Sequence, residues 1–212
     1  VAAASAAVLD DTYYQDALGK SGEELKSALH TIISDQTKLS YSQVWDALKD
    51  TDEDPANSSN VVLLYTGRSQ SKDSNGGGSG QWNREHVWAK SHGDFGTSTG
   101  PGTDIHHLRP TDVQVNSTRG NKDFDEGGSE LSDAPGNFTD DDSFEPRDEV
   151  KGDVARMILY MAVRYEATTP SPTWSPTTRS TTARSRTWAS CRCSSSGARR
   201  TRRTASSSGA TT

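Results

Sequence analysis

Two short polar clusters contain residues that could do acid–base chemistry next to a bound cation. The first is Asn83-Arg-Glu-His86, which places a carboxylate beside an imidazole. Neighbouring side chains on a strand point to opposite faces, but at a strand end the backbone can turn both toward one cleft. An isolated Glu–His pair can equally be surface decoration, so this cluster alone does not identify a site.

The second cluster supplies the groups that the first one lacks. Asp104-Ile-His-His-Leu-Arg-Pro110 is followed by Asn116-Ser-Thr-Arg-Gly-Asn121, which adds imidazole, guanidinium and two side-chain amides. Oxygen ligands such as Glu85 and an Asn carbonyl suit Mg²⁺ or Ca²⁺ better than zinc. A neutral histidine beside such a cation can take a proton from water, and arginines can hold a phosphate. Together these groups predict a phosphodiester hydrolase.

A zinc hydrolase is the less favoured interpretation. Glu85-His86 is not the His-Glu-x-x-His motif of zinc proteases. His86 and His92 are six residues apart, so they would not share a helix face.

Composition and length indicate one domain without a membrane span. The chain has 212 residues, of which 30% are hydrophobic, a low share for a globular protein. No apolar run approaches the roughly 18 residues that a spanning helix needs, so we expect no membrane partner. Residues 1–9 begin with the small-residue sequence typical of secretory cleavage sites, and we expect them to remain after signal cleavage in a secreted protein.

Residues 167–212 differ in composition from the rest of the chain. Residues 170–212 contain eight Arg, no acid and none of Leu, Ile, Val, Phe, Met or Tyr, although the whole chain has 29 Asp and Glu and a net charge of −6. Such a segment cannot bury enough apolar surface to fold, so we expect a disordered tail. It is either a basic arm for nucleic-acid phosphates or, as we prefer, the result of a frameshift near Ala167. Cys191 and Cys193 also fall in this tail, so we give them no structural role.

Helical periodicity occurs in two regions. Apolar residues recur at spacings of three to four within residues 22–48, and Ser21 with Glu24 has the pattern of a capping box for the first helix there. Residues 148–165 predict a helix whose apolar face packs on the core, with Arg164 away from that face.

Strands are expected between these helical regions. Residues 60–66 are β-branched and apolar, which predicts a buried strand. Residues 82–88 alternate weakly, as a second strand would. Residues 104–121 are expected to pass from an extended piece through Pro110 into a helix over residues 111–117.

Four longer strings resemble a known family. They are Tyr65-Thr-Gly-Arg68, Trp82-Asn-Arg-Glu-His-Val-Trp-Ala-Lys-Ser-His92, Gly100-Pro-Gly-Thr-Asp-Ile-His-His-Leu-Arg-Pro-Thr-Asp112 and Val115-Asn-Ser-Thr-Arg-Gly-Asn-Lys-Asp-Phe-Asp125. They resemble the endonuclease I family of secreted bacterial nucleases, in particular its Bacillus extracellular type. The resemblance covers residues 10–166. It implies a single nuclease domain there, of the α+β class, with a ββα-metal (His-Me finger) core surrounded by helices.

The resemblance also implies roles for individual residues. His86 would be the general base, and Glu85 and Asn116 would hold the metal ion, with Asn121 as the alternative amide. The ion would be Mg²⁺, with Ca²⁺ or Mn²⁺ as alternatives. Family arginines contact the phosphate, and the candidates here are Arg109, Arg119 and Arg156.

Two of these residues have a second interpretation. His107 would orient the water or the substrate, or it would be a buried, hydrogen-bonded imidazole. Arg156 would contact phosphate, or it would form an ordinary ion pair on its helix. His30 and His92 fall outside this set of site residues.

These residues predict a secreted, sequence-nonspecific endonuclease. His86, held by a hydrogen bond to a backbone carbonyl, would take a proton from the attacking water, while one divalent cation neutralises the developing charge, giving 5′-phosphate ends. The reaction does not need a 2′-hydroxyl, so DNA and RNA are both expected substrates. Because the chain is acidic, binding requires a local basic cleft. We expect a monomer. The alternative is an inactive, truncated remnant that only binds nucleic acid.

Overall fold

The computed structural model describes residues 12–165. The segment expected to follow signal cleavage, residues 1–9, and the tail, residues 167–212, lie outside the described residues. Both stay predictions.

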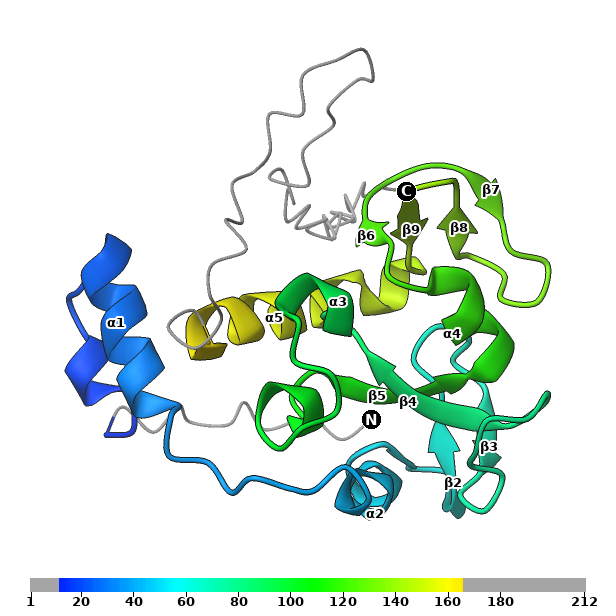
Figure 1. Ribbon diagram of the computed structural model, residues 1–212, viewed down its shortest axis with the longest axis horizontal. Coiled ribbons are helices and arrows are strands. Elements are labelled where there is room, and N and C mark those ends of the chain that lie inside the picture. The colour runs from blue at the N-terminus through cyan, green and yellow to red at the C-terminus, as the bar shows by residue number, and fades with distance from the viewer. Residues whose placement is uncertain (1–11, 166–212) are drawn as a thin grey trace, which may run out of the picture.

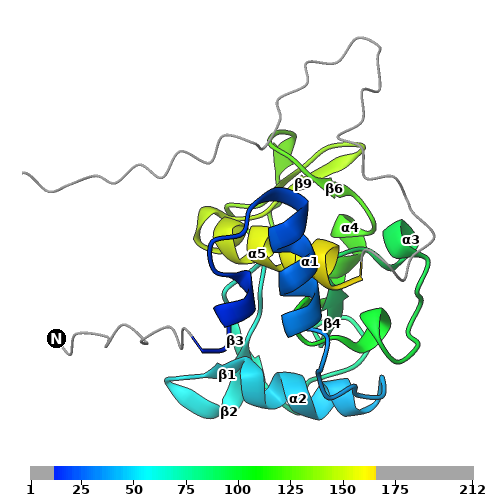
Figure 2. The same cartoon turned by 90° about the vertical axis from the view of Figure 1, so that its left-hand side faces the viewer.

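The described chain forms helices and three small sheets, and the sheets lie toward one end of the molecule, with α1 at the other (Figure 1). The longest helix, α5, runs through the middle of the fold, and α1 packs against it (Figures 1 and 2). The helices are α1 (Gly22–Ile32), α2 (Gln43–Thr51), α3 (Lys90–Gly93), α4 (Val113–Arg119) and α5 (Asp148–Tyr165), with short 3₁₀ helices η1 (Gln15–Ala17) and η2 (Pro101–Thr103).

The strands are short and mostly antiparallel. The first sheet has the order β1 (Glu53–Asp54), β2 (Asn57–Val62), β3 (Ser69–Ser71), and the second pairs β4 (Trp82–His86) with β5 (Leu108–Asp112). The third has the order β6 (Asp123–Phe124), β9 (Ser143–Glu145), β8 (Phe138–Thr139), β7 (Ser129–Glu130), and within it only the β6–β9 pair is parallel.

The β4–β5 pair and α4 form the part of the fold that carries the candidate site. In the antiparallel register, Glu85 lies opposite Arg109 and His86 opposite Leu108. Helix α4 begins directly after β5, because the Asp112 carboxylate accepts hydrogen bonds from the backbone N–H groups of Gln114 and Val115. The helix then packs against both strands. The fold is of the mixed helix and sheet type that the sequence predicted, and the ββα-metal core stays a prediction.

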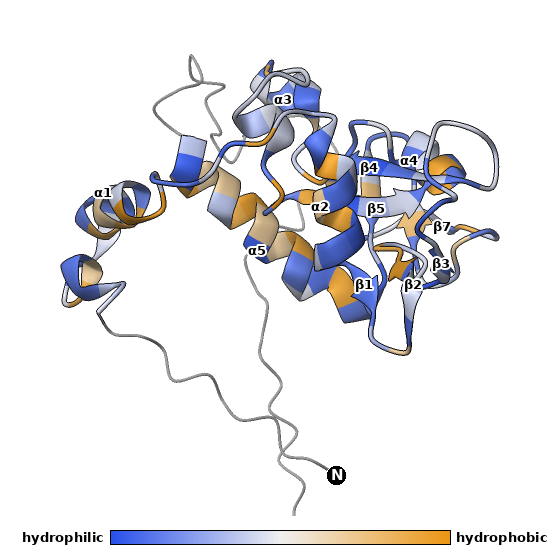
Figure 3. Ribbon diagram, turned by 90° about the horizontal axis from the view of Figure 1, so that it is seen from below, coloured by the Kyte–Doolittle hydropathy of each residue, from blue (hydrophilic) through white to orange (hydrophobic). Residues whose placement is uncertain are grey.

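Two apolar clusters hold this unit in place. One packs α2 on the outer face of the β4–β5 pair through buried residues that include Leu48, Trp82 and Leu108. The other packs α5 under the opposite side, with Tyr65, Phe144 and Val154 among its members. The hydrophobic stripes of α2 and α5 are visible in Figure 3. Because packing fixes β4 from both sides, side chains on its two faces have defined surroundings.

The helices expected over residues 148–165 and within residues 22–48 are present, but two details were wrong. The Ser21 side chain makes no capping hydrogen bond, and Gly22 has a φ of 56°, so the chain enters α1 by a glycine turn. Arg164 is buried at 7% exposure. Its guanidinium donates to Gln36 Oε1 and the Ser34 carbonyl, which lets a cation occupy an apolar face.

The strands differ from the expectation at their ends. The strand expected over residues 60–66 stops at Val62, and the chain then turns while keeping Leu63, Leu64 and Tyr65 buried. The apolar run therefore predicted correctly that residues 63–65 are buried, but these residues do not continue the strand. The expected helix over residues 111–117 begins two residues later, because Thr111 and Asp112 complete β5. No helix among residues 12–165 is long and apolar enough to cross a membrane.

Candidate active site

Glu85 lies on the face of β4 that α4 covers, and it is 2% exposed. The Tyr65 hydroxyl donates to Glu85 Oε1 at 2.8 Å, and Arg119 Nη1 lies 3.1 Å from the same oxygen. Burial raises the pKa of Glu85, and the Arg119 cation and the Tyr65 hydrogen bond offset only part of this rise. The carboxylate is therefore a buried anion whose charge is balanced by one neighbouring cation.

Arg119 fastens α4 to the end of β4. Its Nη1 donates to the His86 carbonyl at 2.9 Å, and its Nη2 donates to the Val87 carbonyl at 2.8 Å. The guanidinium also lies over the Phe124 ring. Since Arg119 is 2% exposed, it supports Glu85 and the strand end and presents almost no surface to a ligand.

The two candidate amides lie at different places. Asn116 Nδ2 donates to Asn83 Oδ1 at 2.6 Å, and Asn83 is two residues before Glu85, on the same face of β4. Asn116 is also one helical turn before Arg119, which contacts Glu85. Asn121 instead lies beyond the end of α4, where its Nδ2 donates to Ser91 Oγ at 3.2 Å. Asn116 is thus the amide at the β4–α4 contact.

The donor types at this contact fit a hard divalent cation. A buried carboxylate and side-chain amide oxygens are ligands that Mg²⁺ and Ca²⁺ accept. Within the described chain, no group of three or more His, Cys, Asp or Glu is placed to hold a metal. A cation held by Glu85 and Asn116 could complete its shell with water and phosphate oxygens, as Mg²⁺ commonly does.

The His86 side chain has a different set of neighbours. Its Nε2 lies 3.0 Å from the Gly102 carbonyl oxygen, and its ring is 5.9 Å from that of Tyr41 and 5.6 Å from that of His107. Because a carbonyl only accepts, Nε2 carries the hydrogen, and Nδ1 keeps a lone pair. The expected hydrogen bond from this ring to a backbone carbonyl is therefore present.

The surroundings of His86 keep it neutral. Burial lowers its pKa to about 3, and the positive charges of Lys90 and Arg84 act in the same direction, against the Gly102 hydrogen bond. Glu85 and His86 are adjacent on β4, so their side chains leave the strand on opposite faces. Arg119 links the two residues, because it bonds the carboxylate of one and the backbone carbonyl of the other.

His107 is a fully buried imidazole. Its Nε2 lies 2.8 Å from the Pro101 carbonyl, and its Nδ1 accepts from the Trp88 N–H at 3.4 Å. Burial lowers its pKa to about 4. With 0% exposure and both ring nitrogens occupied, His107 fits the buried, hydrogen-bonded interpretation. It packs beside His86 and holds the same loop, since Pro101 and Gly102 supply the two carbonyls.

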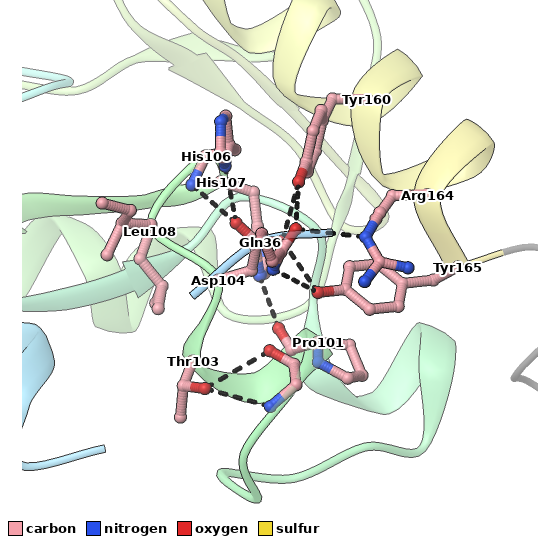
Figure 4. Close-up of polar contacts among 12 residues, drawn as sticks. Gln36, Pro101, Thr103, Asp104, His106, His107, Leu108, Tyr160, Arg164 and Tyr165 are labelled. Atoms are coloured by element: carbon pink, nitrogen blue, oxygen red, sulfur yellow. Dashed lines mark hydrogen bonds and ion pairs between the residues drawn. The ribbon is translucent and has the colours of Figure 1, made fainter. Parts of the chain in front are cut away.

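Asp104 is the residue of this region whose role the sequence did not reveal. Its Oδ2 accepts hydrogen bonds from Gln36 at 2.8 Å, Tyr165 at 2.7 Å and Tyr160 at 3.1 Å, and its Oδ1 contacts the ring and the backbone N–H of His106 (Figure 4). Burial raises the pKa of Asp104, but these hydrogen bonds bring it well below its usual value. The carboxylate thus ties the loop before β5 to α5.

Two of the candidate arginines are bonded away from Glu85 and His86. Arg109 Nη1 donates to the carbonyls of Ile105 and Leu108, and its Nε lies 3.7 Å from Asp52. Arg156 forms an ion pair with Asp153, and its side chain is 73% exposed. The ion-paired interpretation therefore describes Arg156 in this structure.

Comparisons with known proteins identify the same family as the four strings of residues described above. The family model described as Endonuclease I matches residues 21–189. A curated protein named extracellular ribonuclease, from Bacillus amyloliquefaciens, is 75% identical over 156 residues, covering 74% of this chain and 54% of the relative. Another of that name, from Bacillus subtilis (strain 168), is 73% identical over 156 residues, with the same coverage. The chain spans about half the length of these relatives. No solved structure matches it.

Proposed function

The chain belongs to the endonuclease I family, and on this premise we propose that it is a secreted, sequence-nonspecific endonuclease. It hydrolyses phosphodiester bonds of DNA and RNA with one divalent cation and with His86 as general base. The observation that carries the proposal is the His86 ring, whose Nε2 is fixed on the Gly102 carbonyl while the imidazole stays neutral.

The geometry of the ring leaves one nitrogen free to accept a proton from water. A neutral imidazole with its donor nitrogen already bonded has one basic site left, Nδ1, with a fixed direction. Packing against Tyr41 and His107 prevents the ring from turning. The water that attacks phosphorus would therefore meet an oriented acceptor, and the products would carry 5′-phosphate ends.

Glu85 and Asn116 are the proposed protein ligands of the cation, with Asn121 as the alternative amide. When bound, Mg²⁺, or Ca²⁺ or Mn²⁺ in its place, would neutralise charge on the phosphate and on the leaving 3′ oxygen. Tyr65 and Arg119 hold the Glu85 carboxylate in place for this role. Arg109, Arg119 and Arg156 remain the arginines proposed from the sequence, and of these Arg119 is the one whose side chain bonds Glu85.

Two features support the proposed substrates and location. The relatives are named extracellular ribonucleases, which supports RNA as one substrate and secretion of this chain. Phosphate contacts carry no base information, so DNA with the same backbone phosphates is the second proposed substrate. We propose that the enzyme acts as a monomer.

A cleavage assay tests this function. Supercoiled plasmid and a structured RNA are incubated with the full chain in Mg²⁺ and in EDTA, and the product ends are mapped by phosphatase and ligase treatment. We expect both substrates to be cut in Mg²⁺ only, leaving 5′-phosphates. Undiminished cutting in EDTA would reject the cation. Retention on DNA without any cutting would instead identify an inactive remnant that binds nucleic acid.

A further inference from the structure

Arg84 occupies a place beside the candidate base that sequence analysis did not single out. It lies two residues before His86, on the same face of β4. The centre of its guanidinium is 3.5 Å from the centroid of the Tyr41 ring and 3.9 Å from that of Trp45. The Tyr41 ring also stacks on the His86 imidazole at 5.9 Å. One aromatic side chain thus contacts both the arginine and the candidate base.

Arg84 combines partial exposure with the lack of a carboxylate partner among the described residues, and the other described arginines do not. Five of them lie within 4.0 Å of a carboxylate: Arg68, Arg109, Arg119, Arg147 and Arg156. Arg164 is buried and bonded to Gln36 and to a backbone carbonyl. Arg84 has no ion pair with any described residue; its Nη1 donates to the Tyr41 carbonyl, and its buried Nε has no hydrogen-bond partner there.

Burial makes this arrangement costly unless an anion completes it. Loss of hydration lowers the pKa of Arg84, although a guanidinium remains charged near neutral pH. Tyr41 and Trp45 contact the flat faces of the guanidinium, so the N–H groups, which point outward in its plane, are not covered by the rings. Such in-plane donors match two oxygens of a phosphate.

We propose that Arg84 binds the phosphate of the substrate beside His86. This inference rests on the proposed function and deepens it by naming the arginine that the sequence left open. Tyr41 and Trp45 hold the guanidinium plane, and Arg84 with the nearby Lys90 supplies positive charge in a chain whose net charge is −6. An acidic nuclease needs such local positive charge to bind a phosphate backbone.

Binding can be measured separately from cleavage. In a His86→Ala background, the affinity for a labelled DNA oligonucleotide is followed by fluorescence anisotropy over a range of salt concentrations. The logarithm of the binding constant falls linearly with the logarithm of the salt concentration. Arg84→Gln should make this slope less steep by about 0.9 for a duplex or about 0.7 for a single strand, because one phosphate contact is lost. Lys20→Gln, which removes one charge from an exposed position before α1, should leave the slope unchanged.

Arg84→Lys guards against a folding defect, because it keeps the charge and an aliphatic stem over the rings. In the His86 background it should keep the salt slope. In the otherwise unchanged enzyme it should lower kcat/KM on the order of tenfold, since a lysine cannot make the paired contacts. Arg84 does not bind phosphate if the unsubstituted chain cleaves and neither Arg84 variant changes either measurement. That outcome means the same salt slope as the His86→Ala protein and the same kcat/KM as the unsubstituted enzyme. If the unsubstituted chain neither cleaves nor binds, the proposed function fails first.

Discussion

Arg119 and Glu85 form an ion pair that water does not reach: Nη1 lies 3.1 Å from Oε1, and both side chains are 2% exposed. Taking two charges out of water costs free energy that their mutual attraction and their hydrogen bonds must offset. Tyr65 bonds the carboxylate, and two backbone carbonyls at the end of β4 accept from the guanidinium, whose Nε has no hydrogen-bond partner among the described residues. The pair therefore joins α4 to the strand that carries both candidate catalytic residues.

Replacing Arg119 by methionine should lower the free energy of unfolding by about 3–5 kcal/mol, because a buried carboxylate is left without its cation. Urea unfolding followed by circular dichroism measures this. The same replacement at Arg156, an exposed ion pair, should change the free energy by less than about 1 kcal/mol. Equal effects at the two positions would contradict the importance of the buried pair.

His86→Ala should reduce the cleavage rate by about a hundredfold or more, the usual scale for loss of a general base. The fold should persist, as judged by the far-ultraviolet spectrum. His92→Ala provides the matched control, because that imidazole is 38% exposed and its ion-pair partner is the exposed Asp123, at 3.6 Å. A His86→Ala protein that retains the original turnover would remove His86 from the mechanism.

Glu85→Gln should raise the Mg²⁺ concentration that gives half-maximal cleavage, because an amide binds a hard cation more weakly than a carboxylate does. The measurement is a Mg²⁺ titration of the initial rate, after confirming that the variant is folded.

The same titration distinguishes the two amides. Asn116→Ala should raise the Mg²⁺ requirement, whereas Asn121→Ala should not, because Asn116 meets β4 at Asn83 and Asn121 contacts Ser91. The reverse order of effects would assign the second ligand to Asn121.

Asp104 should make stability depend on pH in the acid range. Its pKa in the folded protein is well below the value of 3.8 expected when unfolded, so the unfolded state binds the proton first. Asp104 therefore contributes fully to the free energy of unfolding at pH values above its pKa in the unfolded chain. This contribution is lost as the pH falls toward its pKa in the folded protein. Asp104→Asn should cost on the order of 2 kcal/mol at neutral pH and flatten the decline between about pH 5 and pH 2. Urea unfolding across this range tests both expectations, and parallel curves for the two proteins would contradict them.

Periodic patterns of apolar residues and start signals in the sequence predicted the long helix α5, the strand β4 and the helix α4. The apolar stripe of residues 148–165 gave α5 its bounds, because a long amphipathic helix has a strong periodic signal. A strand was predicted over residues 82–88 and observed over Trp82–His86, and the extended piece predicted before Pro110 is part of the strand Leu108–Asp112. The helix after it was predicted from its Pro-Thr-Asp start, two residues too early. The resemblance supplied the assignment of roles to His86 and Glu85, which spacing alone left open.

Contacts between distant residues could not be predicted in the same way. Asp104 meets Gln36 and Tyr165 across 68 and 61 positions, and nothing near any of them in sequence marks the meeting. The resemblance offered Arg119 as one of three candidate phosphate contacts, but no local pattern predicted that the helix would turn its guanidinium inward toward Glu85. Arg84 went unnoticed because its distinction is partial exposure without an anionic partner among the described residues, which only the packed structure reveals.

The Asp104 contacts also set an order of assembly. The loop that orients His86 is held by tyrosines near the end of α5, so we expect it to settle only after α5 has docked, because contacts of long sequence separation form late. During synthesis, a growing chain would therefore carry its imidazole without the loop that aims it. On the proposed function, the producing cell's own RNA would be spared until translation has passed the last tyrosine.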